Sequence, residues 1–289
     1  MHPLVRTTSI FLFALISLAS CGSEPAASPG AASPALQPLL ALAGTLDIAG
    51  GTAHIPVMKE AAKRIMTANP KIRITVAGGG SGVGIQKAGE GLAQIGNAGR
   101  PLSDEEKERF GLASTPFAVD GVAVVVHPSR EVRDLTTAQV LDIFAGRITD
   151  WSELGGEAGG INLYGRDEAS GTRSVFWKKA LKKGEIAKAT NIVTSNGAMK
   201  TAVSNDPRAI GYLSIGHVSE KVAAVAIDGV EPSQENAKSG AYKVTRLLFM
   251  NTKGESQGLT RAFVDYILSE EGASIIRDCG YIPYDPSNR

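Results

Sequence analysis

From about residue 46 onward, short apolar runs rich in Val and Ile alternate with longer stretches in which apolar residues recur every three or four positions. Runs of the first kind are typical of buried β-strands, and stretches of the second kind are typical of amphipathic helices. Regular alternation of the two predicts an α/β fold in which helices cover largely parallel sheets. The chain has 289 residues, 43% of them hydrophobic, which is enough for two ordinary domains.

The expected elements fall into two groups. Strands are predicted at residues 46–49, 72–76, 122–126, 161–164, 209–214, 222–227 and 244–250. Helices are predicted at residues 58–69, 83–90, 136–144, 172–182, 258–268 and 271–278, with a short helix that begins after Ser103. This order predicts two α/β lobes joined by two crossings, with residues 46–122 plus 246–289 in the first lobe and residues 123–245 in the second.

The first twenty residues have the composition of a secretory signal peptide. Arg6 gives a basic start, and the apolar run at residues 10–19 is too short to cross a bilayer as a helix. Residues 18–21, Leu-Ala-Ser-Cys, resemble the bacterial lipobox, in which the cysteine is acylated and becomes the first residue of the mature chain. We interpret residues 1–20 as a lipoprotein signal peptide and Cys21 as a membrane anchor in the cell envelope, outside the cytoplasm. The alternative is an ordinary signal peptide followed by a chance cysteine.

Residues 21–45 consist mostly of Ala, Ser, Pro, Gly and Leu, with Glu24 as the single charge. Such a composition predicts a flexible tether between the lipid and the folded part. If Cys21 carries lipid, Cys279 has no partner, so the fold cannot depend on a disulfide bond. We expect Cys279 to be a small core residue.

Charge and motifs exclude several classes of function. The chain has 30 Lys and Arg against 29 Asp and Glu, so no excess of positive charge draws it to nucleic acid. Neither a GxGxxG fingerprint after a strand nor a GxxxxGK[ST] loop occurs, which leaves dinucleotide and P-loop sites unsupported. No GxSxG or HExxH motif occurs either, so we expect no catalytic nucleophile, no metal and no cofactor. His54 could line a binding loop, but a capping or surface role is the simpler expectation.

Three predicted strand-to-helix turns combine small residues with hydroxyls. They are Gly-Gly-Thr-Ala at residues 50–53, Gly-Ser-Gly at residues 80–82 and Ala-Ser-Gly-Thr at residues 169–172. A helix start exposes unpaired N–H groups and the positive end of the helix dipole, and glycine lets an anion approach the backbone. Arg166, which precedes the third turn, adds paired donors with a permanent charge. Three such turns could surround one tetrahedral oxyanion, although each alone is also an ordinary N-cap and Arg166 could be a surface charge paired with Asp167 or Glu168.

Five runs resemble the phosphate-binding proteins of bacterial phosphate ABC transporters, the PstS type. They are GGGSGVGI at residues 78–85, DGVAV at 120–124, LDIFAGRITDW at 141–151, GRDEASGTR at 165–173 and SNGAM at 195–199. The elements Arg-x-x-x-Ser-Gly-Thr and Phe-x-Gly-x-Ile-x-x-Trp are the most specific of these. The similarity covers nearly everything after the tether.

The resemblance implies a two-lobed type II periplasmic-binding-protein fold, in which two α/β domains are joined by two crossing hinge strands and close on phosphate. It further implies a monomer that passes phosphate to the membrane permease subunits of an ABC importer, without cofactor or catalysis. Matched position by position, it places the phosphate ligands at Thr52, the Ala53 amide, Ser81, Arg166, Ser170, Gly171 and Thr172.

The chain departs from the family pattern at one point. Some members carry an Asp, which accepts the proton of hydrogen phosphate, in the segment that matches residues 95–102, whereas this chain has no acid there. A carboxylate pairs with protonated phosphate and repels sulfate, so the means of discrimination stays open. Asp120 is a substitute candidate for the acceptor, with a strand-end or hinge role as the alternative. Further candidates near the ligand are Gly82, Arg100, Asn196, Gly197 and Ala198.

Two other functions remain open at this stage. The same fold could bind a different oxyanion, such as sulfate or molybdate. Less in keeping with the sequence is a phosphomonoester hydrolase, because no nucleophile or general base stands beside the three turns.

Overall fold

The computed structural model describes residues 33–287. The predicted signal peptide at residues 1–20, Cys21 and the first part of the predicted tether lie outside these residues. Within residues 33–287, no helix combines the length and apolar character that a membrane crossing needs. Cys279 is free and partly buried.

The predicted tether is wrong from about residue 36 onward, because this part of the chain is folded. Leu36 and Leu39 are buried, α1 covers Gln37–Leu40, and β1 already begins at Gly44. The Asn69 side chain donates hydrogen bonds to the carbonyls of Leu39 and Leu42, both at 2.8 Å. The Ala- and Pro-rich composition therefore predicted a tether, although two leucines in this segment pack onto the first lobe.

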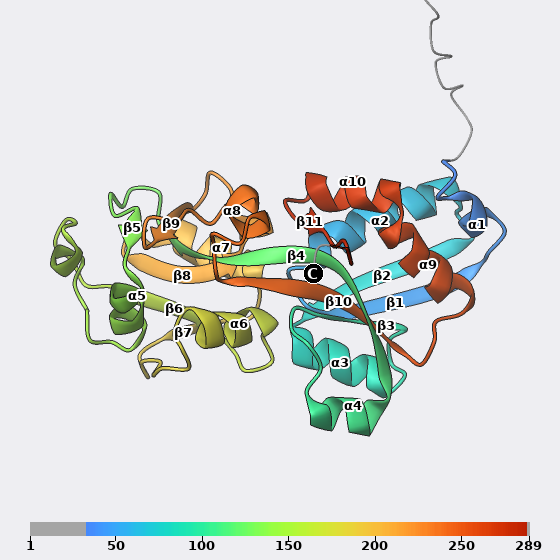
Figure 1. Ribbon diagram of the computed structural model, residues 1–289, viewed down its shortest axis with the longest axis horizontal. Helices are drawn as coiled ribbons and strands as arrows, with labels where there is room; N and C mark the ends of the chain where they lie inside the picture. Colours follow the sequence, from blue (N-terminus) through green and yellow to red (C-terminus); the bar gives the residue numbers. More distant parts are fainter. Residues whose placement is uncertain (1–32, 288–289) are drawn as a thin grey trace, which may run out of the picture. The chain divides into compact units, whose positions relative to one another are not determined.

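The first lobe is built on strands in the order β2-β1-β3-β10-β4. Its elements are β1 (Gly44–Gly50), α2 (Ile55–Ala68), β2 (Ile72–Gly79), α3 (Ser81–Gly89), β3 (Ile95–Ala98), α4 (Asp104–Phe110), β4 (Leu112–Val126), β10 (Thr245–Lys253), α9 (Gly258–Leu268), α10 (Glu270–Asp278) and β11 (Ile282–Pro283). β1 pairs in parallel with β2 and β3, while β10 is antiparallel to β3 and β4. Figure 1 shows α2, α9 and α10 on one side of these strands and α3 and α4 on the other.

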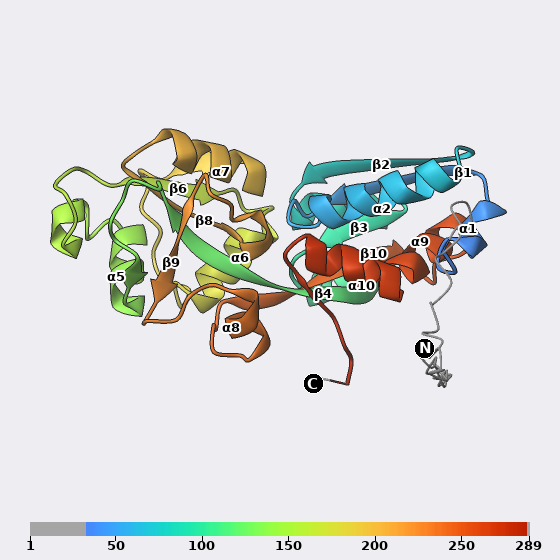
Figure 2. The same cartoon turned by 90° about the horizontal axis from the view of Figure 1, so that it is seen from above.

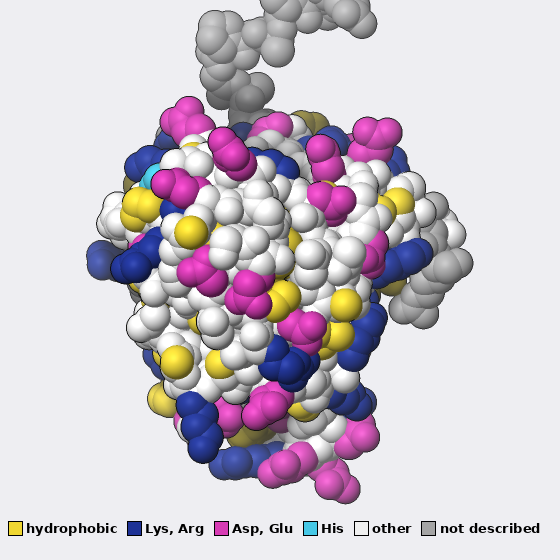
Figure 3. Space-filling model, turned by 90° about the vertical axis from the view of Figure 1, so that its left-hand side faces the viewer, with side chains coloured by type: hydrophobic (Ala, Val, Ile, Leu, Met, Phe, Trp, Pro, Cys, Tyr) yellow, Lys and Arg dark blue, Asp and Glu magenta, His cyan; other side chains and the backbone are white. Residues whose placement is uncertain are grey.

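The second lobe continues from β4 through strands in the order β4-β8-β6-β7. Its elements are β5 (Asp134–Leu135), α5 (Thr137–Phe144), a 3₁₀ turn (Trp151–Leu154), β6 (Asn162–Arg166), α6 (Gly171–Lys179), β7 (Asn191–Val193), α7 (Asn196–Asn205), β8 (Ala209–Ser214), a 3₁₀ turn (Ile215–His217), β9 (Ala223–Ile227) and α8 (Gln234–Lys238). The core of this lobe gathers the inward side of β4 and a group of aromatic residues, namely Val122, Val124, Val126, Phe144, Trp151, Phe176 and Tyr212. On the end of the lobe drawn in Figure 3, acidic and basic side chains are intermixed without a broad field of one sign.

Two strands connect the lobes. β4 pairs with β10 up to Gly121 and with β8 from Val122 onward, and β10 begins at the same level with Thr245 opposite Gly121. Figures 1 and 2 both show β4 and β10 running from one group of elements to the other. The predicted two-lobed α/β fold class is confirmed. The residue bounds given to the lobes, 46–122 plus 246–289 and 123–245, stay a prediction.

Candidate functional site

The three predicted turns meet at one small cavity between the lobes. The space in the cavity is about 10 Å³, and it is lined by Gly51, Thr52, Ala53, His54, Gly80, Ser81, Gly99, Arg166, Ser170, Gly171, Thr172 and Arg246. All seven residues that were matched to phosphate ligands belong to this lining. Each turn leads directly into a helix, α2, α3 or α6, so three helix starts face one space.

Glycines let the second and third turns approach each other closely. Gly80 has a φ of 89°, and a Cβ built there would lie 2.8 Å from the carbonyl oxygen of Ala169. A Cβ at Gly171 would overlap the hydroxyl of Ser81. The Gly82 amide donates to the Ala169 carbonyl at 3.0 Å, which ties the two turns together across the lobes.

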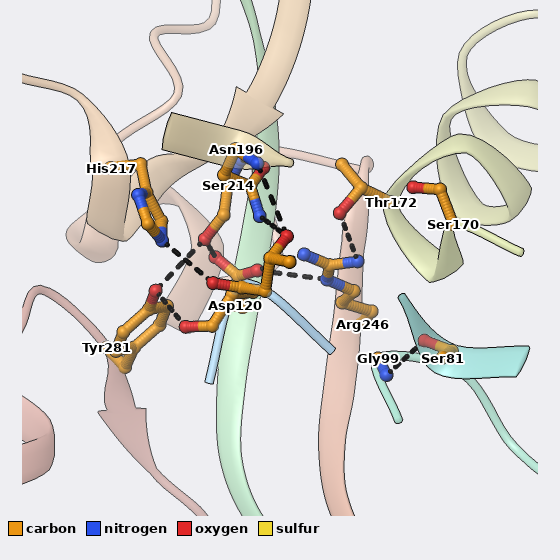
Figure 4. A network of polar contacts seen from close by, with 12 residues as sticks. Ser81, Gly99, Asp120, Ser170, Thr172, Asn196, Ser214, His217, Arg246 and Tyr281 are labelled. Carbon is orange, nitrogen blue, oxygen red and sulfur yellow. Dashed lines mark hydrogen bonds and ion pairs between the residues drawn. The ribbon is translucent and has the colours of Figure 1, made fainter. Parts of the chain in front are cut away.

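Each of the four hydroxyls in the cavity accepts a hydrogen bond within the protein, and Figure 4 shows those to Ser81 and Thr172. The bonds are Asn196 Nδ2 to Thr52 Oγ1 at 3.1 Å, Gly99 N to Ser81 Oγ at 2.9 Å, Arg173 N to Ser170 Oγ at 3.2 Å and Arg246 Nη1 to Thr172 Oγ1 at 3.0 Å. A hydroxyl has one hydrogen to donate in addition to its lone pairs. The incoming bonds occupy lone pairs, so all four hydroxyl hydrogens are available for an acceptor in the cavity.

Arg166 is 1% exposed, so the alternative of a surface charge is wrong. Its Nη2 donates to the carbonyl of Thr194 at 3.0 Å, whereas its Nε and Nη1 are buried without a hydrogen-bond partner. The backbone is held by Tyr212, whose hydroxyl accepts from the Arg166 amide at 3.0 Å. Burial lowers the pKa of the guanidinium, but an arginine keeps its charge in proteins. A buried, unpaired cation is costly, and an anion in the cavity would remove that cost.

A second guanidinium, that of Arg246, also lines the cavity. Arg246 lies on β10 directly opposite Asp120 on β4, and its Nη2 is 2.8 Å from the Asp120 carboxylate. Sequence reasoning missed Arg246 because no Gly or hydroxyl motif surrounds it. The only available signal was a charge inside the otherwise apolar run at residues 244–250.

Asp120 does not belong to the lining of the cavity. Its carboxylate accepts from Arg246 Nε and from the hydroxyl of Ser214, both at 2.9 Å. Burial raises the pKa of this carboxyl, while the neighbouring Arg246 opposes the shift. Because Asp120 lies behind Arg246 at the crossing of the lobes, the hinge alternative fits it better than the role of proton acceptor.

The remaining candidates contribute contacts beside the cavity rather than its lining. Asn196 binds Thr52 across the lobes, and the Ala198 amide donates to Ser195 at the N-cap of α7, next to Gly197. Arg100 forms a bidentate pair with Glu106, with both bonds at 2.7 Å. Asn196 and Gly82 thus hold the lobes together, and Arg100 braces the start of α4.

Two histidines near the cavity are neutral. His54 is 0% exposed, so the expected surface role is wrong. It occupies the N-cap position of α2, but its side chain makes no capping hydrogen bond and instead lines the cavity. Burial, together with the charge of Arg246, lowers the pKa of His54 to about 3. Burial also lowers the pKa of His217, whose Nε2 is 3.2 Å from the Thr52 carbonyl, to about 4. The positive charge of the cavity therefore comes from Arg166 and Arg246. Over residues 33–287, no cluster of His, Cys, Asp or Glu could hold a metal ion.

Comparison with known proteins gives consistent matches. A family model described as a PBP superfamily domain matches residues 35–271. The chain is 40% identical over 245 residues to the phosphate-binding protein PstS of Bacillus subtilis, covering 83% of this chain and 81% of the relative. It is 28% identical over 250 residues to PstS of Borreliella burgdorferi, covering 82% and 89%.

Solved structures agree with these matches. A Clostridium perfringens protein described as a phosphate ABC transporter substrate-binding protein, with bound phosphate, superposes with a TM-score of 0.80 at 37% identity, covering 84% of this chain and all of the other. An ABC-type phosphate transport receptor of Vibrio cholerae superposes with a TM-score of 0.66 at 29% identity, covering 82% and 99%.

Proposed function

The chain belongs to the PstS-type phosphate-binding proteins of the periplasmic-binding-protein superfamily, and on this premise we propose that it captures inorganic phosphate outside the cytoplasm and delivers it to an ABC-type import permease. The observation that carries the proposal is the cavity in which Arg166 holds two buried donors without acceptors. Four hydroxyl hydrogens and the first amides of α6 complete a set of donors around it.

Each predicted ligand has a role in this proposal. Arg166 binds phosphate oxygens through Nε and Nη1, since these two donors have no hydrogen-bond partner among residues 33–287. Thr52, Ser81, Ser170 and Thr172 donate their hydroxyl hydrogens, while the amides of Ala53 and Gly171 add backbone donors at two helix starts. Charge-assisted bonds of this kind hold a dehydrated anion tightly.

The size of the cavity supports an inorganic ligand. Sites for organic molecules commonly measure ~300–1,000 Å³, whereas the space in this cavity is only about 10 Å³. A phosphomonoester would need additional space for its organic part. The relatives are transport binding proteins, and we propose that this protein likewise binds phosphate without catalysing a reaction.

The proposal includes attachment to a membrane. Lipidation of Cys21 rests on the Leu-Ala-Ser-Cys motif and on the signal-like residues before it. A monomer is the simplest state for a protein that moves between ligand capture and a permease.

Titration calorimetry with phosphate-free protein tests the proposal. Arg166→Ala should weaken phosphate binding by about thirtyfold or more, on the order of 2–5 kcal/mol, because it removes a buried cation from the ligand. Arg100→Ala is the matched control, since Arg100 pairs with Glu106 outside the cavity, and its affinity should stay at the wild-type level. Equal affinity of Arg166→Ala and wild type would place the site elsewhere. The same titration with sulfate and molybdate compares the alternative ligands.

A further inference from the structure

The hinge carries a buried ion pair whose cation faces the cavity. Arg246 and Asp120 occupy opposite positions in the β10–β4 ladder, at the level where the chain crosses between the lobes. Their side chains are 3% and 0% exposed. Arg246 lines the cavity and Asp120 does not.

The donors of Arg246 are only partly used by the protein. Nε donates to Asp120 Oδ2 at 2.9 Å, and Nη1 donates to the Thr172 hydroxyl at 3.0 Å. Nη2 is close to Asp120 but has no well-directed acceptor. A guanidinium has five N–H donors, so several of them remain for a ligand. Figure 4 shows the guanidinium of Arg246 between Asp120 and Thr172, with Gly99 and Ser81 nearby.

Fold stability alone gives little reason for an arginine at this position. The four residues that follow Arg246 in the strand are apolar, and replacing a buried ion pair by packed apolar residues is often neutral or stabilising. A cation held at the wall of a closed cavity, in contrast, can interact with an anion where water no longer screens the charge.

We propose that Arg246 is a second cation that contacts the bound oxyanion, and that Asp120 is the positioning residue that holds it. This inference rests on the proposed function and specifies its ligand further. Arg166 and Arg246 give the lining two positive charges, while His54 contributes none and the Asp120 charge lies behind Arg246. The site therefore selects a tetrahedral oxyanion with two negative charges over one with a single charge.

Arg246 also links the ligand to the third turn. Its Nη1 holds the hydroxyl oxygen of Thr172, so the Thr172 hydrogen is directed away from Arg246 and stays available to the ligand. Behind Arg246, the hydroxyl of Ser214 donates to Asp120 Oδ1 at 2.9 Å and fixes the carboxylate. The order Ser214, Asp120, Arg246, Thr172 runs from the end of β8 through both hinge strands to α6.

Three variants test the inference, each measured by phosphate titration calorimetry and by thermal unfolding. Arg246→Gln should weaken phosphate binding by about tenfold or more, because one of the two cations is lost. Asp120→Asn should weaken phosphate binding by a smaller factor, since Arg246 keeps its charge but the residue that positions it becomes neutral. The double variant Asp120→Asn with Arg246→Gln removes both charges, so it should regain thermal stability yet bind phosphate as weakly as Arg246→Gln.

A purely structural ion pair gives the same pattern of thermal stability but a different pattern of phosphate affinity. In that case the single variants lose thermal stability, the double variant recovers it, and phosphate affinity follows stability back toward the wild type. Recovery of affinity in the double variant, or wild-type affinity in Arg246→Gln, overturns the inference. If Arg246→Gln does not fold, the double variant alone decides, because it leaves no unpaired buried charge.

The proposed function can fail separately. If the wild type and Arg100→Ala do not bind phosphate, the proposed function is wrong. If they bind, Arg166→Ala does not, and Arg246→Gln binds as the wild type does, only the role of Arg246 is wrong.

Discussion

Acidification from about pH 7 to about pH 5 should destabilise this protein by about 2 kcal/mol through His54 alone. His54 is fully buried, and burial together with Arg246 lowers its pKa from 6.5 to about 3. Below pH 6.5 the unfolded chain binds a proton at this imidazole, while the folded protein does not until the pH approaches 3. The stabilisation is thus present above pH 6.5 and is lost as the pH falls toward 3.

The magnitude follows from the distance below the unfolded pKa. At about pH 5 the imidazole is about 1.5 units below its ordinary pKa, and each unit corresponds to about 1.4 kcal/mol, which gives about 2 kcal/mol. His217 acts in the same direction because its pKa is lowered to about 4, although it is only partly buried. Asp120 acts in the opposite direction, since burial raises its pKa and the folded state then holds its proton more readily.

Urea denaturation at both pH values isolates the contribution of His54. Between about pH 7 and about pH 5, His54→Gln should lose about 2 kcal/mol less unfolding free energy than the wild type. The difference reports on His54 alone, because His217 and Asp120 are the same in both proteins. Phe117→Leu is the matched control: its ring centroid is 5.5 Å from that of His54, so it disturbs the same core without removing a titratable group. Equal pH sensitivity in His54→Gln and wild type would refute the reasoning.

Two further changes test the geometry of the site and the fold. Gly171→Ala should fold normally but bind phosphate about tenfold more weakly or worse in calorimetry, because its Cβ would overlap the Ser81 hydroxyl and hold the lobes apart; wild-type affinity would mean that this approach is unnecessary. Ser103→Ala removes the N-cap of α4, where Ser103 and Glu106 form a capping box, and should lower the unfolding free energy by about 1 kcal/mol in urea titrations. Unchanged urea stability would show that the box contributes nothing.

The order of strands and helices was largely predictable, but β4 was found only in part. The prediction covered residues 122–126, while β4 spans Leu112–Val126. Its first half contains Ser114, Thr115 and Pro116, and a proline argues against a central strand. In the structure the ladder with β10 shifts register between Leu248 and Phe249, opposite Ala118 and Pro116. The proline is accommodated at this irregularity, which single-strand patterning cannot reveal.

The start of the folded region shows a different limit of sequence reasoning. Composition describes a segment by its average, and residues 21–45 have the average of a linker. Their attachment depends on two buried leucines and on Asn69, whose side chain binds carbonyls nearly thirty residues earlier in the chain. No local pattern encodes such a contact.

The site divides in the same way between local and distant contributions. Thr52, Ser81, Ser170 and Arg166 lie in short motifs at strand ends, and motifs of this kind can be recognised without knowledge of the fold. Arg246 reaches the cavity through its pairing with Asp120, 126 positions away in the sequence. Sequence reasoning therefore identified the hydroxyls and one cation, whereas the second cation and the neutral state of His54 depend on tertiary packing.

Lobe closure and anion binding follow from one electrostatic condition. With the lobes together, two donors of Arg166 are buried without acceptors, and Nη2 of Arg246 has no well-directed one. Water would satisfy these donors if the lobes separated, so closure over an uncharged space costs free energy. An oxyanion supplies the missing acceptors only when the second and third turns meet, because Ser81 and Gly171 come from different lobes. The anion should therefore stabilise the closed arrangement by RT ln(1 + [anion]/Kd), so that closure is favoured when the protein is loaded.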